Sequence, residues 1–87
     1  MKTVAIKLAV ALGLFNPHYV HFTWQQSVSG AVVISCGLNH NQYPLQVCQS
    51  LTMKCNSHKF VAGVTYFCTA SEPGILGKSN EVTFQAK

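Results

Sequence analysis

The chain has 87 residues, and its charged side chains are six Lys and two Glu, with no Arg and no Asp, for a formal net charge of +4. This length makes at most one domain. Without Arg, which supplies the planar fork for phosphates and base edges, the chain is not expected to read nucleic acid specifically. The small net charge does not by itself define a partner.

Residues 1–22 are predicted to be a signal peptide or an N-terminal arm. Lys2 and Lys7 precede or border the charge-free apolar run 8–15, which is the pattern of a signal peptide and is too short to span a bilayer. An alternative stays open, because apolar residues alternate with small or polar ones over residues 4–14. That is the period of a half-buried β-strand, although such a strand would be long.

Residues 16–26 are then expected to form a short pro-segment or an irregular arm, with cleavage anywhere from residue 14 to residue 30. His18 and His21 have the H-x-x-H spacing that places two rings on one helical face, as in some metal sites. Pro17 and its aromatic and β-branched neighbours disfavour a helix, and no further ligand lies nearby. No metal site is therefore expected in this segment.

Residues 23–87 are predicted to form a single disulfide-stabilised β domain, because short β-like runs alternate with polar turns and no helical stripe is present. Val32, Ile34 and Cys36 share one face of the first run. Phe60, Ala62, Val64, Tyr66 and Cys68 share one face of a later run. We expect an all-β fold, a small disulfide-stapled antiparallel β-sandwich or sheet of about four to six short strands.

Four cysteines, Cys36, Cys48, Cys55 and Cys68, occur without any C-x-x-C pair, which in a short chain indicates two disulfides made in an oxidising compartment. The shared inward phase favours a Cys36–Cys68 bond and leaves Cys48 and Cys55 to close a short loop, while the other two pairings stay open. Tyr66 is expected to cover the sulfur atoms with its ring and to hydrogen-bond a backbone group through its hydroxyl.

Acid–base chemistry in the β domain is limited to four side chains, His40, His58, Glu72 and Glu81. A Glu–His pair could move the proton of a ribose hydroxyl in a small nuclease. Such an enzyme would lack an Arg for the developing phosphate charge and would have to use a Lys. No catalytic activity is therefore expected.

Two cysteine–histidine spacings could suit zinc, Cys36-x3-His40 and Cys55-x2-His58. This arrangement would leave Cys48 and Cys68 without a role, and an oxidising compartment favours disulfides over thiolate ligands. Neither a metal nor another cofactor is expected.

The layout of a short signal, a compact body, few cysteines and the aromatic-x-Cys element Tyr66-Phe67-Cys68 resembles the small secreted cysteine-rich effectors of plant-pathogenic fungi. That resemblance implies two small antiparallel sheets fixed by one or two disulfides, and activity through binding of host proteins.

The stretch GVTYFCTAS, residues 63–71, resembles the F strand of an immunoglobulin-type domain, in which a Tyr lies two residues before the second cysteine. In this resemblance AVVISC, residues 31–36, would be the B strand. Once an N-terminal signal is removed, too few residues remain for seven strands, so the resemblance implies a truncated immunoglobulin-like recognition module.

These observations predict a secreted, extracellular, non-enzymatic binding protein, an effector or toxin-like factor that recognises a protein of a host or competitor. The alternative is a mildly cationic antimicrobial protein that acts on membranes, which are otherwise a secondary contact. Lys54, His58 and Lys59, on the polar connection around Cys55, are the predicted binding residues, because rigidly held loops concentrate recognition residues. The second choice of surface is the apolar loop within residues 71–80.

Overall fold

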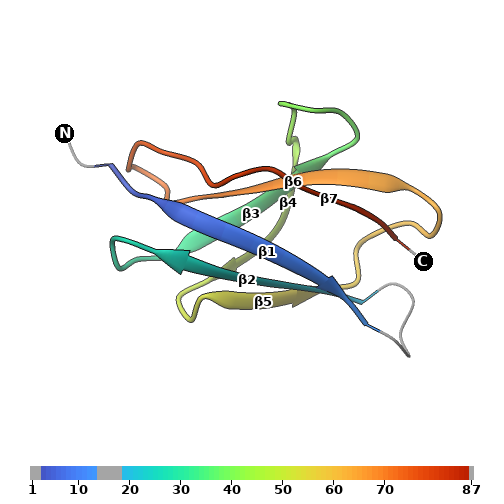
Figure 1. The fold of residues 1–87 in the computed structure, drawn as a ribbon, viewed down its shortest axis with the longest axis horizontal. Coiled ribbons are helices and arrows are strands. Elements are labelled where there is room, and N and C mark those ends of the chain that lie inside the picture. Colours follow the sequence, from blue (N-terminus) through green and yellow to red (C-terminus); the bar gives the residue numbers. More distant parts are fainter. Residues whose placement is uncertain (1–2, 14–18, 87) are drawn as a thin grey trace.

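The computed structural model describes residues 3–13 and 19–86, and in these ranges the chain is an all-β sandwich of two antiparallel sheets (Figure 1). Its strands are β1 (Ile6–Leu12), β2 (Val20–Gln26), β3 (Val32–Gly37), β4 (Leu45–Ser50), β5 (Lys54–Ser57), β6 (Thr65–Ser71) and β7 (Val82–Gln85). One sheet has the order β1-β2-β5 and the other β4-β3-β6-β7. The described residues contain no helix capable of crossing a membrane.

The predicted all-β, disulfide-stapled fold is confirmed, but there are seven strands instead of four to six. The additional strands come from the N-terminal segment. In β1, Ile6 and Leu8 are buried while Lys7 and Ala9 are exposed, as the alternative interpretation of a half-buried strand expects. The division of the chain at residue 22 stays a prediction, and it falls inside β2.

The expected irregular arm is wrong for Val20–Gln26, which is a regular strand. Val20, Phe22 and Trp24 alternate inward and are buried, so the aromatic and β-branched residues that disfavour a helix here satisfy the period of a strand. β2 is the central strand of its sheet, pairing with β1 on one side and with β5 on the other.

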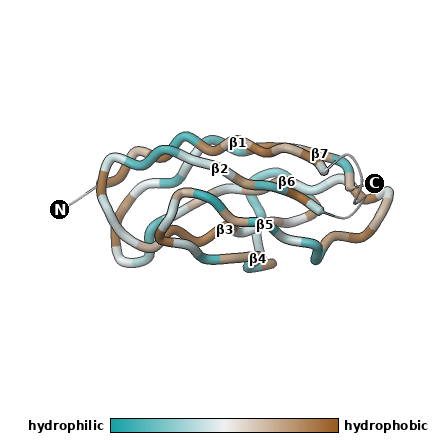
Figure 2. The backbone as a smooth tube through the Cα atoms, turned by 90° about the horizontal axis from the view of Figure 1, so that it is seen from below, coloured by the Kyte–Doolittle hydropathy of each residue, from teal (hydrophilic) through white to brown (hydrophobic). Residues whose placement is uncertain are grey.

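The core lies between the two sheets, and Figure 2 shows hydrophobic and hydrophilic residues alternating along the strands that enclose it. An aromatic group fills one part of it. The ring of Phe60 lies 4.8 Å from that of Tyr66 and 5.0 Å from that of Phe84, centroid to centroid, and Phe22 lies 6.1 Å from Phe84. Edge-to-face contacts of this kind stabilise a core beyond the area that they bury.

Tyr66 has the structural role predicted for its hydroxyl, which accepts a hydrogen bond of 2.9 Å from the backbone N–H of Val61. The strand that contains it begins later than predicted, at Thr65. Gly63 has a φ of 84°, a left-handed conformation that a side chain disfavours, and it turns the chain before β6. Ala62 is therefore exposed in a turn, and does not share the inward face of Phe60 and Tyr66.

Both disulfides have the predicted pairing. Cys36–Cys68 joins the neighbouring strands β3 and β6 within the four-stranded sheet, where the two Cα atoms are 4.1 Å apart. Cys48–Cys55 joins β4 to β5 and so connects the two sheets at one side of the sandwich. The first bond fixes the register of two core strands, and the second holds the sheets together.

In a constant-type immunoglobulin sandwich, strands one, two, five and four form one sheet and strands three, six and seven form the other; the present arrangement is the same except for its fourth strand. β4 extends the second sheet beside β3. Cys68 lies in the sixth strand, as the sequence resemblance implies, but Cys36 lies in the third strand and not in the second. The Cys36–Cys68 bond therefore stays within one sheet, whereas the corresponding bond of antibody domains joins the two sheets.

Candidate functional site

The carboxylate of Glu81 organises the connection between β3 and β4. Its Oε2 lies 2.5 Å from Nδ1 of His40, and its Oε1 accepts hydrogen bonds from the hydroxyl of Tyr43 at 2.7 Å and from the backbone N–H of Asn41 at 3.3 Å. Glu81 itself directly precedes β7. One carboxylate therefore attaches the connection 38–44 to the start of β7, the edge strand on the far side of the same sheet.

The turn at the tip of this connection is compatible with its sequence. Asn39 and Gln42 form an isolated antiparallel bridge, and Asn41 between them has a φ of 64°. Asn is one of the few residues with a side chain that adopts this left-handed conformation readily. The turn directs the N–H of Asn41 toward Glu81.

Two further contacts complete what we call the Glu81 cluster, which comprises His40, Tyr43, Phe67, Lys78 and Glu81. The ring of His40 lies 4.1 Å from that of Phe67 in β6, centroid to centroid. The ammonium nitrogen of Lys78 lies 5.6 Å from the centre of the Tyr43 ring, within range of a cation–π interaction. The cluster thus gathers three rings and two charged groups from three segments of the chain.

Electrostatics in the cluster follow from these contacts. The hydrogen bond from Tyr43, followed by that from His40, holds the pKa of Glu81 below its ordinary value, while partial burial acts in the opposite direction. Burial and the neighbouring Glu81 carboxylate raise the pKa of Tyr43 above 10.0. At neutral pH the cluster therefore contains a carboxylate and a neutral phenol.

The His40–Glu81 pair is the combination that a nuclease would need, but it faces solvent: the side chain of His40 is 67% exposed. Two depressions of the described surface lie over β1 and β2, on the other sheet. Neither of these depressions is lined by a residue of the cluster, so its exposed rings and charges suit contact with a partner surface better than enclosure of a substrate.

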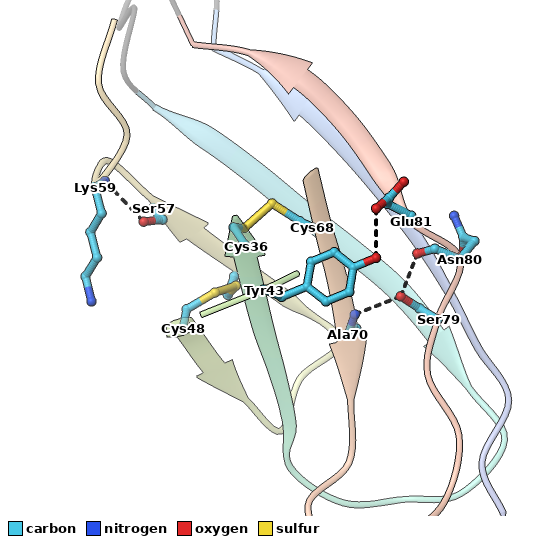
Figure 3. The surroundings of a disulfide bond; sticks show 11 residues. Cys36, Tyr43, Cys48, Ser57, Lys59, Cys68, Ala70, Ser79, Asn80 and Glu81 are labelled. Atoms are coloured by element: carbon cyan, nitrogen blue, oxygen red, sulfur yellow. Dashed lines mark hydrogen bonds between the residues drawn. A yellow bond between two sulfur atoms is a disulfide. The ribbon is translucent and has the colours of Figure 1, made fainter. Parts of the chain in front are cut away.

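The predicted binding residues lie elsewhere. Lys54 belongs to the edge strand β5, opposite Thr23, and not to a loop, because the segment after the β4–β5 turn pairs with β2. His58 and Lys59 follow that strand and are exposed, and the N–H of Lys59 donates to Oγ of Ser57 at 3.3 Å. Figure 3 shows Lys59 and Glu81 on opposite sides of the disulfides. Binding through Lys54, His58 and Lys59 stays a prediction.

The spacings considered for zinc do not form a site. Cys36 and Cys55 are both in disulfides, so neither offers a thiolate. Nδ1 of His21 lies 2.7 Å from Oδ1 of Asn56, whereas His18 lies outside the described residues. Across ranges 3–13 and 19–86, no three His, Cys, Asp or Glu side chains gather as metal ligands would.

Sequence analysis identified His40 and Glu81 as separate acid–base candidates and did not identify Tyr43, Phe67 or Lys78. The contacts to Glu81 span 38 to 41 residues, so no local motif connects them. These residues come together through the register of β3, β6 and β7, and a single sequence does not reveal that register.

Glu72 has a contrasting environment at the end of the sandwich where the β2–β3 and β6–β7 connections meet. Its side chain is 3% exposed, and among the described residues its Oε2 has no hydrogen-bond partner. Gly30, with a φ of 153°, packs so closely on this carboxylate that a Cβ at residue 30 would collide with it. The burial of Glu72 was not expected from the sequence.

No protein-family model, curated protein or solved structure matches the chain.

Proposed function

We propose that the chain is a secreted, non-enzymatic binding protein that recognises another protein through the Glu81 cluster. The observation that carries this proposal is the set of three contacts by which Glu81 holds the exposed connection 38–44 in one conformation. Loops positioned by a rigid scaffold are where recognition residues concentrate.

The composition of this surface supports a protein partner. Tyr43, Phe67 and His40 present rigid rings that lose little conformational entropy on binding, and aromatic side chains are enriched at the centres of protein interfaces. Leu38 and Leu45, at the two ends of the connection, are 60% and 39% exposed. Apolar contact area thus borders the rings and the charged groups.

Pre-organisation supports the same function. Because His40, Asn41 and Tyr43 are already held by Glu81, the connection has less freedom to lose when a partner binds. The two disulfides are typical of an oxidising environment and stabilise a small scaffold. The resemblance to secreted effectors is the reason that this proposal includes secretion and a partner that belongs to a host or competitor.

A binding experiment with three matched proteins tests the proposal. Extracellular proteins of candidate hosts are screened for a partner of the intact protein, and the dissociation constant of that partner is then measured for Tyr43→Ala, for Lys54→Glu/Lys59→Glu and for Ser29→Ala. Ser29 is exposed in the connection between β2 and β3, outside the cluster. We expect Tyr43→Ala to weaken binding at least about tenfold, as a central aromatic contact does, and the Ser29 control to bind normally.

Two outcomes would contradict the proposal. If only the Lys54→Glu/Lys59→Glu protein loses affinity while its melting temperature is unchanged, recognition occurs at the surface predicted from sequence. If the protein has no protein partner and releases dye from anionic vesicles at micromolar concentration, it acts on membranes.

A further inference from the structure

The outward face of the three-stranded sheet has a composition different from that of the Glu81 cluster. Small or polar side chains cover its middle, where the register places Ala9 beside Thr23 and Thr23 beside Lys54. Lys7 lies beside Gln25 on the same face. All five of these side chains are exposed, because they alternate with the buried residues of β1, β2 and β5.

This face is also hollowed. Two shallow depressions with volumes of about 360 and 380 Å³ lie along β1 and β2, and both are lined by Lys7 and Gln25. The first extends toward Ala9 and Thr23, and the second toward Ser27. Together they form a trough along the two strands with Lys7 near its middle.

The cations of this face are not neutralised. The chain has only two acidic residues, Glu72 and Glu81. The first is buried, and the second is held by His40 and Tyr43 on the other sheet. Among the described residues, the one ion pair is that of His40 with Glu81, so Lys7 and Lys54 have no acidic neighbour. The trough therefore has a positive potential that attracts anions.

We infer that this trough binds an acidic polysaccharide, a chain of sugars that carries carboxylate or sulfate groups. Lys7 and Lys54 attract the anionic groups, while the amide of Gln25 and the hydroxyl of Thr23 hydrogen-bond sugar hydroxyls. The small side chain of Ala9 leaves room for a ring to lie against the sheet. This ligand and the protein partner of the proposed function use different sheets, so the two proposals fail independently.

Other polyanions fit the face less well. Single-stranded nucleic acid is held by base stacking on aromatic side chains, and Trp24, the one described aromatic residue that lines these depressions, is buried in the core. The half-buried rings of Tyr19, just before β2, and His21, on the outward face of β2, line neither depression and pack edge-to-face on each other. An anionic membrane is held by inserted apolar side chains as well as charge. Within the described part of the chain, the exposed large apolar residues all lie outside β1, β2 and β5; they are Leu38, Leu45, Leu51, Met53, Val61 and Leu76.

Isothermal titration of the disulfide-bonded full chain with polygalacturonic acid at low ionic strength tests this inference, with neutral dextran as the control ligand. Lys7→Gln and Lys54→Gln should each weaken binding about threefold or more, and the matched substitution Lys78→Gln, on the other sheet, by less than about twofold. In the double variant Lys7→Gln/Lys54→Gln, the magnitude of the slope of log K against log salt concentration should decrease by about two, the number of charges removed.

A second pair of variants separates loss of the site from loss of the fold. Thr23→Glu places an anion between Lys7 and Lys54 on an exposed strand position, and Thr83→Glu makes the same change on β7. With equal melting temperatures, only Thr23→Glu should abolish binding. The inference is overturned if polygalacturonic acid does not bind, or if Lys78→Gln weakens the binding of polygalacturonic acid as much as Lys7→Gln does. Tighter binding of single-stranded DNA or anionic vesicles at equal charge would also overturn it.

Discussion

The two carboxylates of the chain occupy opposite environments. Glu81 accepts hydrogen bonds from Tyr43 and Asn41 and contacts His40, whereas Glu72 is almost fully buried with an oxygen that accepts no hydrogen bond from any described residue. A carboxylate with several donors stabilises the fold, because its ionised form is favoured there. A buried carboxylate without donors costs free energy, because it has left water without replacement.

Acid should weaken the Glu81 cluster. The folded-state pKa of Glu81 lies below its ordinary value of 4.5. The contribution of Glu81 to the stability of the fold is therefore complete above pH 4.5 and is lost as the pH falls through the folded-state pKa. We expect the melting temperature of the natural protein to fall on acidification below about pH 4.5, and that of Glu81→Gln to fall less. If the melting temperatures of the two proteins change in parallel with pH, ionisation of Glu81 does not contribute to the stability of the fold.

Glu72→Gln should increase stability. The amide has the shape of the carboxylate and carries no charge, so the free energy of unfolding should rise by about 1 kcal/mol. Urea denaturation at neutral pH measures this difference. Glu72→Ala is the companion variant, which removes the charge but leaves a void beside Gly30 and should not stabilise. A loss of more than about 1 kcal/mol in Glu72→Gln would mean that the carboxylate has an acceptor role that its surroundings conceal.

Among the elements, β1 is held by contacts that are distant in sequence. On the side of β1 away from β2, the side chain of Asn80 accepts a hydrogen bond from the N–H of Leu8 at 2.9 Å and donates one to its C=O at 3.0 Å. Nearby, the N–H of Val4 donates to the C=O of Leu76 at 2.9 Å. Asn80 thus satisfies the backbone of an edge strand as a neighbouring strand would.

Asn80→Ala should destabilise the protein by about 1 to 2 kcal/mol, because it removes both hydrogen bonds. Amide exchange at Leu8 should accelerate. Asn80→Asp keeps an acceptor for the N–H of Leu8 but loses the donor to its C=O. The stability of this variant should therefore lie between that of the natural protein and that of Asn80→Ala. Equal stabilities of all three proteins, measured by denaturation, would show that β1 needs no contact beyond β2.

Sequence patterns predicted the elements whose periodicity is local. They failed where two different structures fit the same stretch of residues equally well. The inward phase of Cys36 and Cys68 predicted their disulfide, and Tyr66 two residues earlier predicted a backbone contact, both of which are present. Residues 4–14 fit both a signal peptide and a half-buried strand. Lys54 was expected in a loop because a polar connection and an exposed edge strand have the same composition.

The Glu81 cluster could not be predicted, because it depends on register rather than composition. His40 and Glu81 meet only when β3 pairs with β6, and β6 with β7, in the observed alignment. Cys36 lies opposite Cys68, so the disulfide contributes to that alignment. The residues were visible in the sequence, but their proximity is a property of the sheet.

At the scale of the whole molecule, the sandwich separates its surfaces. The four-stranded sheet carries the Glu81 cluster, and the three-stranded sheet carries the trough that Lys7 lines, with Lys54 beside Thr23. Cys48–Cys55 joins the two layers, and Cys36–Cys68 joins two strands within one of them. By loop closure, Cys36–Cys68 stabilises by about 3.5 kcal/mol and Cys48–Cys55 by about 2.5 kcal/mol. Each value is comparable to the net stability of a small domain.

β1 is as necessary to this arrangement as the disulfides, which makes its removal the sharpest test of the fold. Val4 and, in β1, Ile6 and Leu8 are each less than 10% exposed. Without this segment, β2 would lose its partner strand along one edge, and the part of the core that β1 shares with β6 and β7 would contact water. Burial of each such side chain stabilises by about 1.5 to 3 kcal/mol, so three of them approach the total stability of a domain of this size.

The chain that starts at residue 14, the earliest predicted cleavage point, should therefore fail to unfold cooperatively on heating, even with both disulfides formed. A synthetic peptide of residues 1–13 added in excess should restore a melting transition, because it can pair with β2 as β1 does. The same peptide with Ile6→Ser and Leu8→Ser is the control and should not. If the chain from residue 14 melts as the full chain does, β1 is dispensable, and a signal cleaved within residues 14–30 is compatible with the folded domain. If it does not, cleavage there and the seven-stranded sandwich exclude each other.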